Sequence, residues 1–217
     1  MKKVRLCLLM LVLLLLTGCS GKITADLYLQ DIMDVVETEE REILTTAVVS
    51  VPTLGDEYND AIAALLQEIF READNFREQT VDFSTVLLAD VRIPVVHIDS
   101  LSEDEDLMSL VVIPLEESGL WFGLTLNEAM FQSIFDFAEE ELWQSLSIED
   151  FTVTIYLIND LRETVVVELD SVYVNREPIL YPEEFELKRR DSLEIVLADI
   201  SRDYAFKHGF LLFGSMD

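Results

Sequence analysis

The first eighteen residues differ in composition from the rest of the chain, and this difference limits which residues can belong to the folded body. A basic head, MKKVR, is followed by Leu6–Leu16, an unbroken run of eleven apolar residues. Such a run is too short to cross a hydrocarbon layer, which needs about 20 helical residues. A basic start, a short apolar run and small residues behind it are typical of a secretory signal peptide. We therefore expect residues 1–18 to be removed and to take no part in the folded body.

The end of the apolar run carries a second signal. Leu16-Thr17-Gly18-Cys19 resembles the lipobox of bacterial lipoproteins, in which small residues precede a cysteine. The resemblance implies cleavage between Gly18 and Cys19 and attachment of diacylglycerol to the Cys19 sulfur, usually with a third acyl chain on the new amino terminus. A single acyl chain gives only marginal membrane binding, at about 0.8 kcal/mol per buried methylene, whereas two or three chains anchor a protein stably.

The residue after the cysteine bears on where the protein resides. In lipoproteins of Gram-negative bacteria, an Asp at this position commonly marks retention in the inner membrane, and here the residue is Ser20. The resemblance thus implies the outer membrane, facing the periplasm, if the source is Gram-negative, and otherwise the outer surface of the cell membrane. Only residues 20–22 separate Cys19 from the first predicted strand, a span of about 10 Å when fully extended. We expect the body to be held close to the bilayer.

The body that remains is strongly acidic and has no thiol of its own. Cys7 lies in the signal segment and Cys19 is the lipidation site, so no disulfide is expected. The signal segment holds three of the 15 bases and none of the 43 acids, so residues 19–217 carry 12 bases and a net charge of −31. Nucleic-acid binding needs basic residues that release counterions from the phosphate backbone, and the strongly negative net charge excludes nucleic acid as a partner. It also repels anionic headgroups, which leaves the acyl chains as the expected membrane contact.

The densest acidic segment is DSLSEDED at residues 99–106. Its carboxylates are candidate oxygen ligands for a divalent cation such as calcium, and they are Asp99, Glu103, Asp104, Glu105 and Asp106. The segment lacks the glycine that an EF-hand loop requires at its sixth position. The simpler interpretation is a solvated linker between two apolar segments.

Hydrophobic alternation and β-branched runs predict a chain rich in strands. We expect strands at residues 23–30, 43–51, 81–89, 91–98, 110–115, 120–125, 151–158, 164–174, 185–187, 193–198 and 205–213. Pro94 argues for an edge strand or a break. The turn at residues 116–119 predicts a hairpin.

Two amphipathic helices are predicted among these strands. Apolar residues at helical spacing indicate one at residues 57–78, with Asp56 as its N-cap. The second covers about residues 126–145, and Thr125 and Glu128 would form a capping box at its start. Phe131, Ile134, Phe135, Ala138 and Leu142 form its expected apolar face.

These elements predict an α+β fold, mainly antiparallel sheet covered by the two helices. The order strand–strand–helix–strand–strand occurs twice, which leaves open two related ββαββ halves. We expect one domain at residues 23–217, with a subdivision near residues 99–107 as an alternative.

Recognisable catalytic motifs are missing from the sequence. It contains no G-x-S-x-G elbow, P-loop or G-x-G-x-x-G. His97 and His208 are not at metal-ligand spacing, and we expect His97 in a strand and His208 in a turn. The basic cluster Lys188-Arg189-Arg190 is expected to pair with neighbouring acids. Trp121, Phe122 and Trp143 are expected to pack in the core.

Several segments carry a resemblance over nearly the whole mature chain. They are KITADLYLQDI after Cys19, Val-Pro at 51–52, ADVRIPV at 89–95, TIYLINDL at 154–161, VYVNREP at 172–178 and LADISRDYAF at 197–206. In these the chain resembles a family of lipoproteins of bacteria and their prophages with a single domain of unknown function. The resemblance implies one continuous domain and brings no catalytic residue.

Two functions remain open from the sequence. The first is a non-enzymatic envelope lipoprotein without a cofactor, which contacts other envelope proteins or maintains the cell surface. The alternative is a lipoprotein that binds a ligand or divalent cation through residues 99–106. An enzyme, such as a hydrolase with paired carboxylates, is the third and least supported option.

Overall fold

The computed structural model describes residues 21–37, 42–53, 55–81, 84–102, 106–115 and 119–216. Predictions that fall on other residues, including the signal peptide, Gly18 and the lipidation site Cys19, lie outside the described residues.

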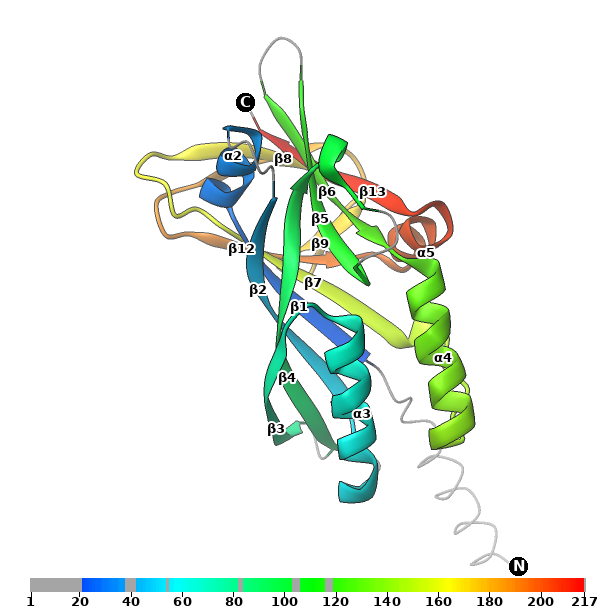
Figure 1. Cartoon of the computed structure of the whole chain (residues 1–217). Helices are drawn as coiled ribbons and strands as arrows, with labels where there is room; N and C mark the ends of the chain where they lie inside the picture. Colours follow the sequence, from blue (N-terminus) through cyan, green and yellow to red (C-terminus); the bar gives the residue numbers. More distant parts are fainter. Residues whose placement is uncertain are drawn as a thin grey trace, which may run out of the picture.

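The strands of this part of the chain join in one mixed sheet (Figure 1). They are β1 (Gly21–Tyr28), β2 (Glu42–Pro52), β3 (Ala73–Val81), β4 (Ser84–His97), β5 (Met108–Pro114), β6 (Leu120–Leu126), β7 (Phe151–Ile158), β8 (Val165–Leu169), β9 (Val172–Val174), β10 (Glu177–Ile179), β11 (Glu183–Leu187), β12 (Ser192–Leu197) and β13 (Phe210–Met216). Their order across the sheet is β10-β9-β12-β7-β1-β2-β4-β5-β6-β13-β8-β11, and β3 pairs with β4 outside this path.

The α-helices of the described chain are short. They are α2 (Leu29–Glu37), α3 (Asp56–Ile69), α4 (Glu128–Leu142) and α5 (Asp199–His208), with short 3₁₀ turns at Ile98–Ser100 and Ile148–Asp150. In Figure 1, α3 and α4 lie beside each other at the end of the molecule where β1 begins.

The expected α+β fold with two helices is wrong. The described chain is mostly β, and its sheet includes two parallel pairs, β1 with β7 and β4 with β5. The two ββαββ halves that the sequence leaves open do not form separate sheets, because β1 lies between β2 of one half and β7 of the other. Pairing between strands far apart in the sequence decides this architecture, and local periodicity carries no record of such pairing.

The predicted helix at 57–78 is too long. Helix α3 ends at Ile69, and Phe70 adopts an extended conformation, with φ −114° and ψ 143°. Residues 73–81 form β3 instead, because β4 offers them a row of backbone hydrogen-bonding groups. The predicted N-cap is also wrong, since Gly55 occupies the N-cap position and Asp56 is the first helical residue.

The second predicted helix is closer to the structure. Helix α4 buries Phe131, Phe135 and Ala138 of its expected apolar face, while Ile134 and Leu142 are half-buried. Its N-cap is Asn127, whose side-chain oxygen accepts a hydrogen bond from the Met130 amide at 3.1 Å, so the predicted capping box at Thr125 is wrong.

The strands predicted at 81–89 and 91–98 are one strand, β4, which contains Pro94. The Arg92 amide donates to the carbonyl oxygen of Glu72 beside β3, at 3.1 Å. Backbone nitrogens two residues apart on a strand face the same flank, so the nitrogen of Pro94 faces this side too. There the neighbour of β4 changes from β3, which reaches Val91, to β5, which starts at Val95. Proline is tolerated because no neighbouring strand requires an amide donor at that position.

Two helices were not predicted. Helix α2 follows β1 directly and buries Leu29, Ile32 and Val35, a spacing that the adjacent strand pattern obscured. Helix α5 occupies the first part of the strand predicted at 205–213, and Gly209 in the left-handed conformation ends it before β13.

Candidate functional site

The first described residue, Gly21, enters the sheet against an aromatic ring. Gly21 pairs in parallel register with Phe151, so β1 and β7 begin at the same end of the molecule. A Cβ placed on Gly21 would lie 2.6 Å from Cε1 of the Phe151 ring. Real side chains do not tolerate such a distance, so the close approach of the chain to this ring requires glycine.

An apolar cavity of about 60 Å³ lies beside this pair, between α3, α4 and the sheet. Gly21 and Phe151 line it, together with residues from both helices and from the strands, among them Ile23, Val51, Leu65, Ile69, Ile134 and Phe137. Gln144 supplies the one polar side chain among the described residues that line the cavity. A wall of this composition suits an apolar guest and offers no charge to an ionic one.

The two helices can form this cavity because each has an apolar stripe of suitable width. In α3 the lining residues Ile62, Leu65, Leu66 and Ile69 follow helical spacing. In α4, Phe131 and Phe135 are buried in the core, while Ile134 and Phe137 are half-buried and line the cavity. Ile134 belongs to the predicted apolar face of α4, whereas Phe137 does not, and the pattern of the helix alone does not show that either residue lines a cavity.

Aromatic rings form the inner side of this region. The Phe131 ring packs edge-on against Phe151 and Phe206, at centroid distances of 5.5 and 5.9 Å. The centroids of the Phe135 and Phe151 rings lie 6.1 Å apart. Phe151 therefore belongs both to the aromatic core and to the cavity wall, and α4, β7 and α5 meet at this point.

Trp143 lies at the carboxyl end of α4, near the cavity. It adopts a left-handed conformation with φ 55°, and 88% of its surface is exposed. Trp121 is 45% exposed, so the expected core packing is wrong for both tryptophans, while Phe122 is fully buried as expected.

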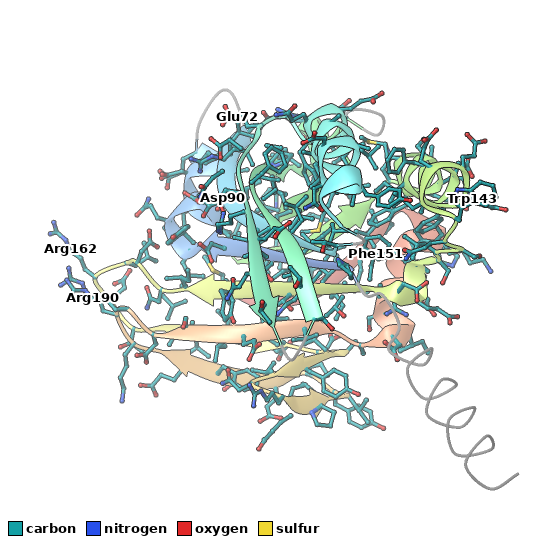
Figure 2. All side chains as sticks on the ribbon, turned by 90° about the horizontal axis from the view of Figure 1, so that it is seen from below. Glu72, Asp90, Trp143, Phe151, Arg162 and Arg190 are labelled. Carbon is teal, nitrogen blue, oxygen red and sulfur yellow. The ribbon has the colours of Figure 1, made fainter. Side chains whose placement is uncertain are left out.

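The basic cluster lies at the other end of β7. The Arg190 amide donates to the carbonyl oxygen of Asn159, which follows β7, at 2.7 Å. Figure 2 shows Arg162 and Arg190 on one side of the molecule and Trp143 on the opposite side. The Asp191 carboxylate accepts a hydrogen bond from the Lys188 amide at 3.0 Å. Within the described residues, the side chains of the Lys188–Arg190 cluster form none of the ion pairs, so the expected pairing is limited to this backbone contact.

The acidic segment is only partly described. Three consecutive acids of the segment, Glu103, Asp104 and Glu105, lie outside the described residues. Both carboxylate oxygens of Asp106 accept hydrogen bonds from Arg71 at 2.7 Å, and Arg71 also pairs with Glu42 at the start of β2. Asp106 is thus committed to an ion pair.

Asp99 is held near the neighbouring histidine. Its amide donates to Nδ1 of the buried His97 at 3.1 Å, in the first turn after β4. No group of three or more His, Cys, Asp or Glu residues in the described part of the chain is arranged to hold a metal ion. His208 is the last residue of α5, just before the turn at Gly209.

A second acidic group surrounds the junction of β1 and α2. The Gln30 amide donates to Asp160 at 3.0 Å, and its side chain donates to Asp34 at 2.6 Å. Burial raises the pKa of Asp31 above its ordinary value, and the nearby charges of Asp160 and Asp34 raise this pKa further. The pKa of Tyr28 is raised by burial and by the charges of nearby aspartates.

None of the helices in the described residues is long and apolar enough to span a membrane. No curated protein and no solved structure matches the chain. A family model described as "Domain of unknown function (DUF7424)" matches residues 21–217, beginning at the residue that opens β1, and the chain belongs to this family.

Proposed function

We propose that this protein is a bacterial or prophage-encoded envelope lipoprotein, anchored by acyl chains on Cys19, which acts by contact with other envelope proteins and not by catalysis. The observation that carries the proposal is the spacing between the lipobox and the fold. Cys19 precedes Gly21, the first residue of β1 and of the family match, by only two positions. The lipid is therefore tied to the end of the body where β1 and β7 begin.

In this proposal the end of the body where β1 and β7 begin faces the membrane, and the surface at this end supports that orientation. The exposed Trp143 follows α4 and precedes Gln144, and both α4 and Gln144 line the cavity that Gly21 also lines. Tryptophan is enriched at the boundary between membrane and water, where its ring contacts lipid and its N–H contacts water. The basic cluster, which lies at the far end of β7, is not needed for membrane contact in this orientation.

The non-catalytic role is supported by the sequence inventory, which holds no recognisable catalytic motif. An acidic body of net charge −31 beyond residue 18 suits contact with basic protein surfaces, because complementary charges accelerate and orient association. With Ser20 after the cysteine, the location we propose is the outer membrane if the source is Gram-negative.

Lipidation is tested by replacing Cys19. In cells fed radiolabelled palmitate, the wild-type full chain should take up label and fractionate with membranes. Cys19→Ser should lose the label and normal signal processing, whereas Cys7→Ser, which changes the other cysteine, should keep both. Unchanged labelling of Cys19→Ser would contradict the anchor.

The interaction role is tested separately. The lipidated protein would be captured from its own membranes after crosslinking, with Cys19→Ser as the matched control, and the partners identified by mass spectrometry. We expect envelope proteins that are retained only with the lipidated form. Turnover of a cell-wall or lipid substrate by the purified protein would overturn the non-catalytic part of the proposal.

A further inference from the structure

We propose that the apolar cavity between α3 and α4 receives the end of an acyl chain carried on Cys19. This inference rests on the proposed lipidation and adds to it a binding site within the body. The protein would then hold part of its own anchor.

The first argument is reach. Gly21 lines the cavity, and Cys19 lies two residues before it, a span of at most about 7 Å. The sulfur is therefore confined near the cavity, while the acyl chain that it would carry is longer than this span. A short tether gives the chain an effective concentration in the millimolar range at the cavity.

The second argument is chemistry. The lining comes from aliphatic and aromatic side chains of both helices and the sheet, with Gln144 as its one polar side chain among the described residues. An apolar cavity stays dry and accepts apolar guests. A phosphate, a sugar or a charged peptide would lose its hydrogen bonds to water there and gain no ionic partner, whereas methylene groups lose nothing.

The third argument is size. A cavity of about 60 Å³ admits only a few methylene groups, so it fits the end of a chain and not its full length. Deeper insertion requires α3 to move away from α4. Because two remaining chains suffice for stable anchoring, a third chain can occupy the body without releasing it from the membrane.

The test uses the full chain, made in bacteria fed a palmitate analogue with a diazirine at its terminal carbon. After purification in detergent, irradiation and digestion, mass spectrometry would locate the crosslinks of the Cys19 lipid. We expect crosslinks to peptides that contain Leu65 or Ile69 of α3 and Ile134 or Phe137 of α4. Label on Cys19 without these crosslinks would overturn the cavity proposal and leave the anchor standing.

Two other results of this crosslinking experiment would lead to different conclusions. An absence of label on Cys19 would overturn both the anchor and the cavity proposal. Crosslinking of α3 and α4 by a diazirine phospholipid in vesicles, with none from the Cys19 lipid, would show that a bilayer lipid is the occupant and would overturn our choice.

A variant and its control sharpen the test. Ala138→Phe places a ring in the cavity wall and should abolish most of the crosslinks. Ala129→Phe adds the same ring at an exposed position of α4 and should leave them unchanged. If Ala138→Phe fails to fold, Leu65→Phe, at a half-buried lining position, takes its place. Unchanged crosslinking in a folded cavity variant would contradict the proposal.

Discussion

The guanidinium of Arg202 donates a hydrogen bond to the carbonyl oxygen of Phe151 at 3.1 Å and so joins α5 to the first residue of β7. Arg202 is only 6% exposed, and it also pairs with Asp203 at 2.9 Å and with Asp199 at 3.2 Å. One buried cation thus fixes the strand end that carries a wall of the cavity.

Removing this guanidinium should destabilise the fold. We expect Arg202→Leu to lower the free energy of unfolding by about 1–3 kcal/mol, because the carbonyl oxygen of Phe151 loses its side-chain donor. Urea unfolding followed by circular dichroism measures the change. Arg162→Leu, which removes an exposed arginine, is the matched control and should have little effect. Equal stabilities of the two variants would contradict this role of Arg202.

A side chain at position 21 should also be costly. Gly21→Ala places a Cβ against the Phe151 ring, and such overpacking typically costs about 1–3 kcal/mol. Thermal unfolding measures the loss. The double variant Gly21→Ala with Phe151→Leu should be less destabilised than the sum of its single changes, because the clash is shared by the two residues. Strict additivity would show that the ring is not what excludes a side chain.

The acidic group near α2 predicts that replacing Asp31 raises the melting temperature in a pH-dependent way. Because the pKa of Asp31 is raised in the folded state, the folded protein binds more protons than the unfolded chain as pH rises above the ordinary value of 3.8, and stability falls. Asp31→Asn removes this loss, so its melting temperature should exceed that of the wild type at pH 7. The advantage should disappear below pH 3.8, where both states are protonated.

The control for this effect is a charge removed elsewhere. Glu140→Gln changes the net charge equally at an exposed position of α4. A gain at pH 7 that is the same for both variants would indicate general charge repulsion and not the surroundings of Asp31.

Trp143 should report the orientation at the membrane. In vesicles that contain brominated lipids, the fluorescence of the lipidated Trp121→Phe variant comes from Trp143 and should be quenched. The Trp143→Phe variant retains Trp121, near the end of the β5–β6 hairpin that Figure 1 places at the other end of the molecule, and should be quenched less. Equal quenching would contradict the proposed orientation.

The calcium alternative has its own measurement. A cation that binds only the folded state raises the melting temperature. Because Asp106 is committed to Arg71, we expect no rise for the full chain at millimolar calcium. A rise that Asp104→Asn and Glu105→Gln abolish, and that magnesium does not reproduce, would favour the cation-binding function instead.

The sequence predicted those elements whose pattern is local. The alternation at Ile23, Ala25 and Leu27 marks the buried face of β1, and that at Val153, Ile155 and Leu157 marks the buried face of β7. β5 and β6 also pair antiparallel, as the predicted hairpin requires. In β1 and β7 the side-chain period of two identifies both the strand and its inner face.

The remaining errors come from long-range pairing. Residues 73–81 carry apolar positions at helical spacing, yet they form β3 because β4 is available to pair with them. The contact of β1 with β7 joins Gly21 to Phe151 across most of the chain, and no local pattern announces it. The cavity could not be predicted either, because the apolar residues of α3 and α4 do not reveal which helix faces which.

The parallel pairing of β1 and β7 also has a mechanical consequence. β1 is hydrogen-bonded to β2 on one side and to β7 on the other. Tension applied at its leading end, along the strand axis, loads both ladders in shear, so many hydrogen bonds share the force and must rupture together. A body attached through this end would resist unfolding under tension far better than one pulled from an edge strand, in which hydrogen bonds break one at a time.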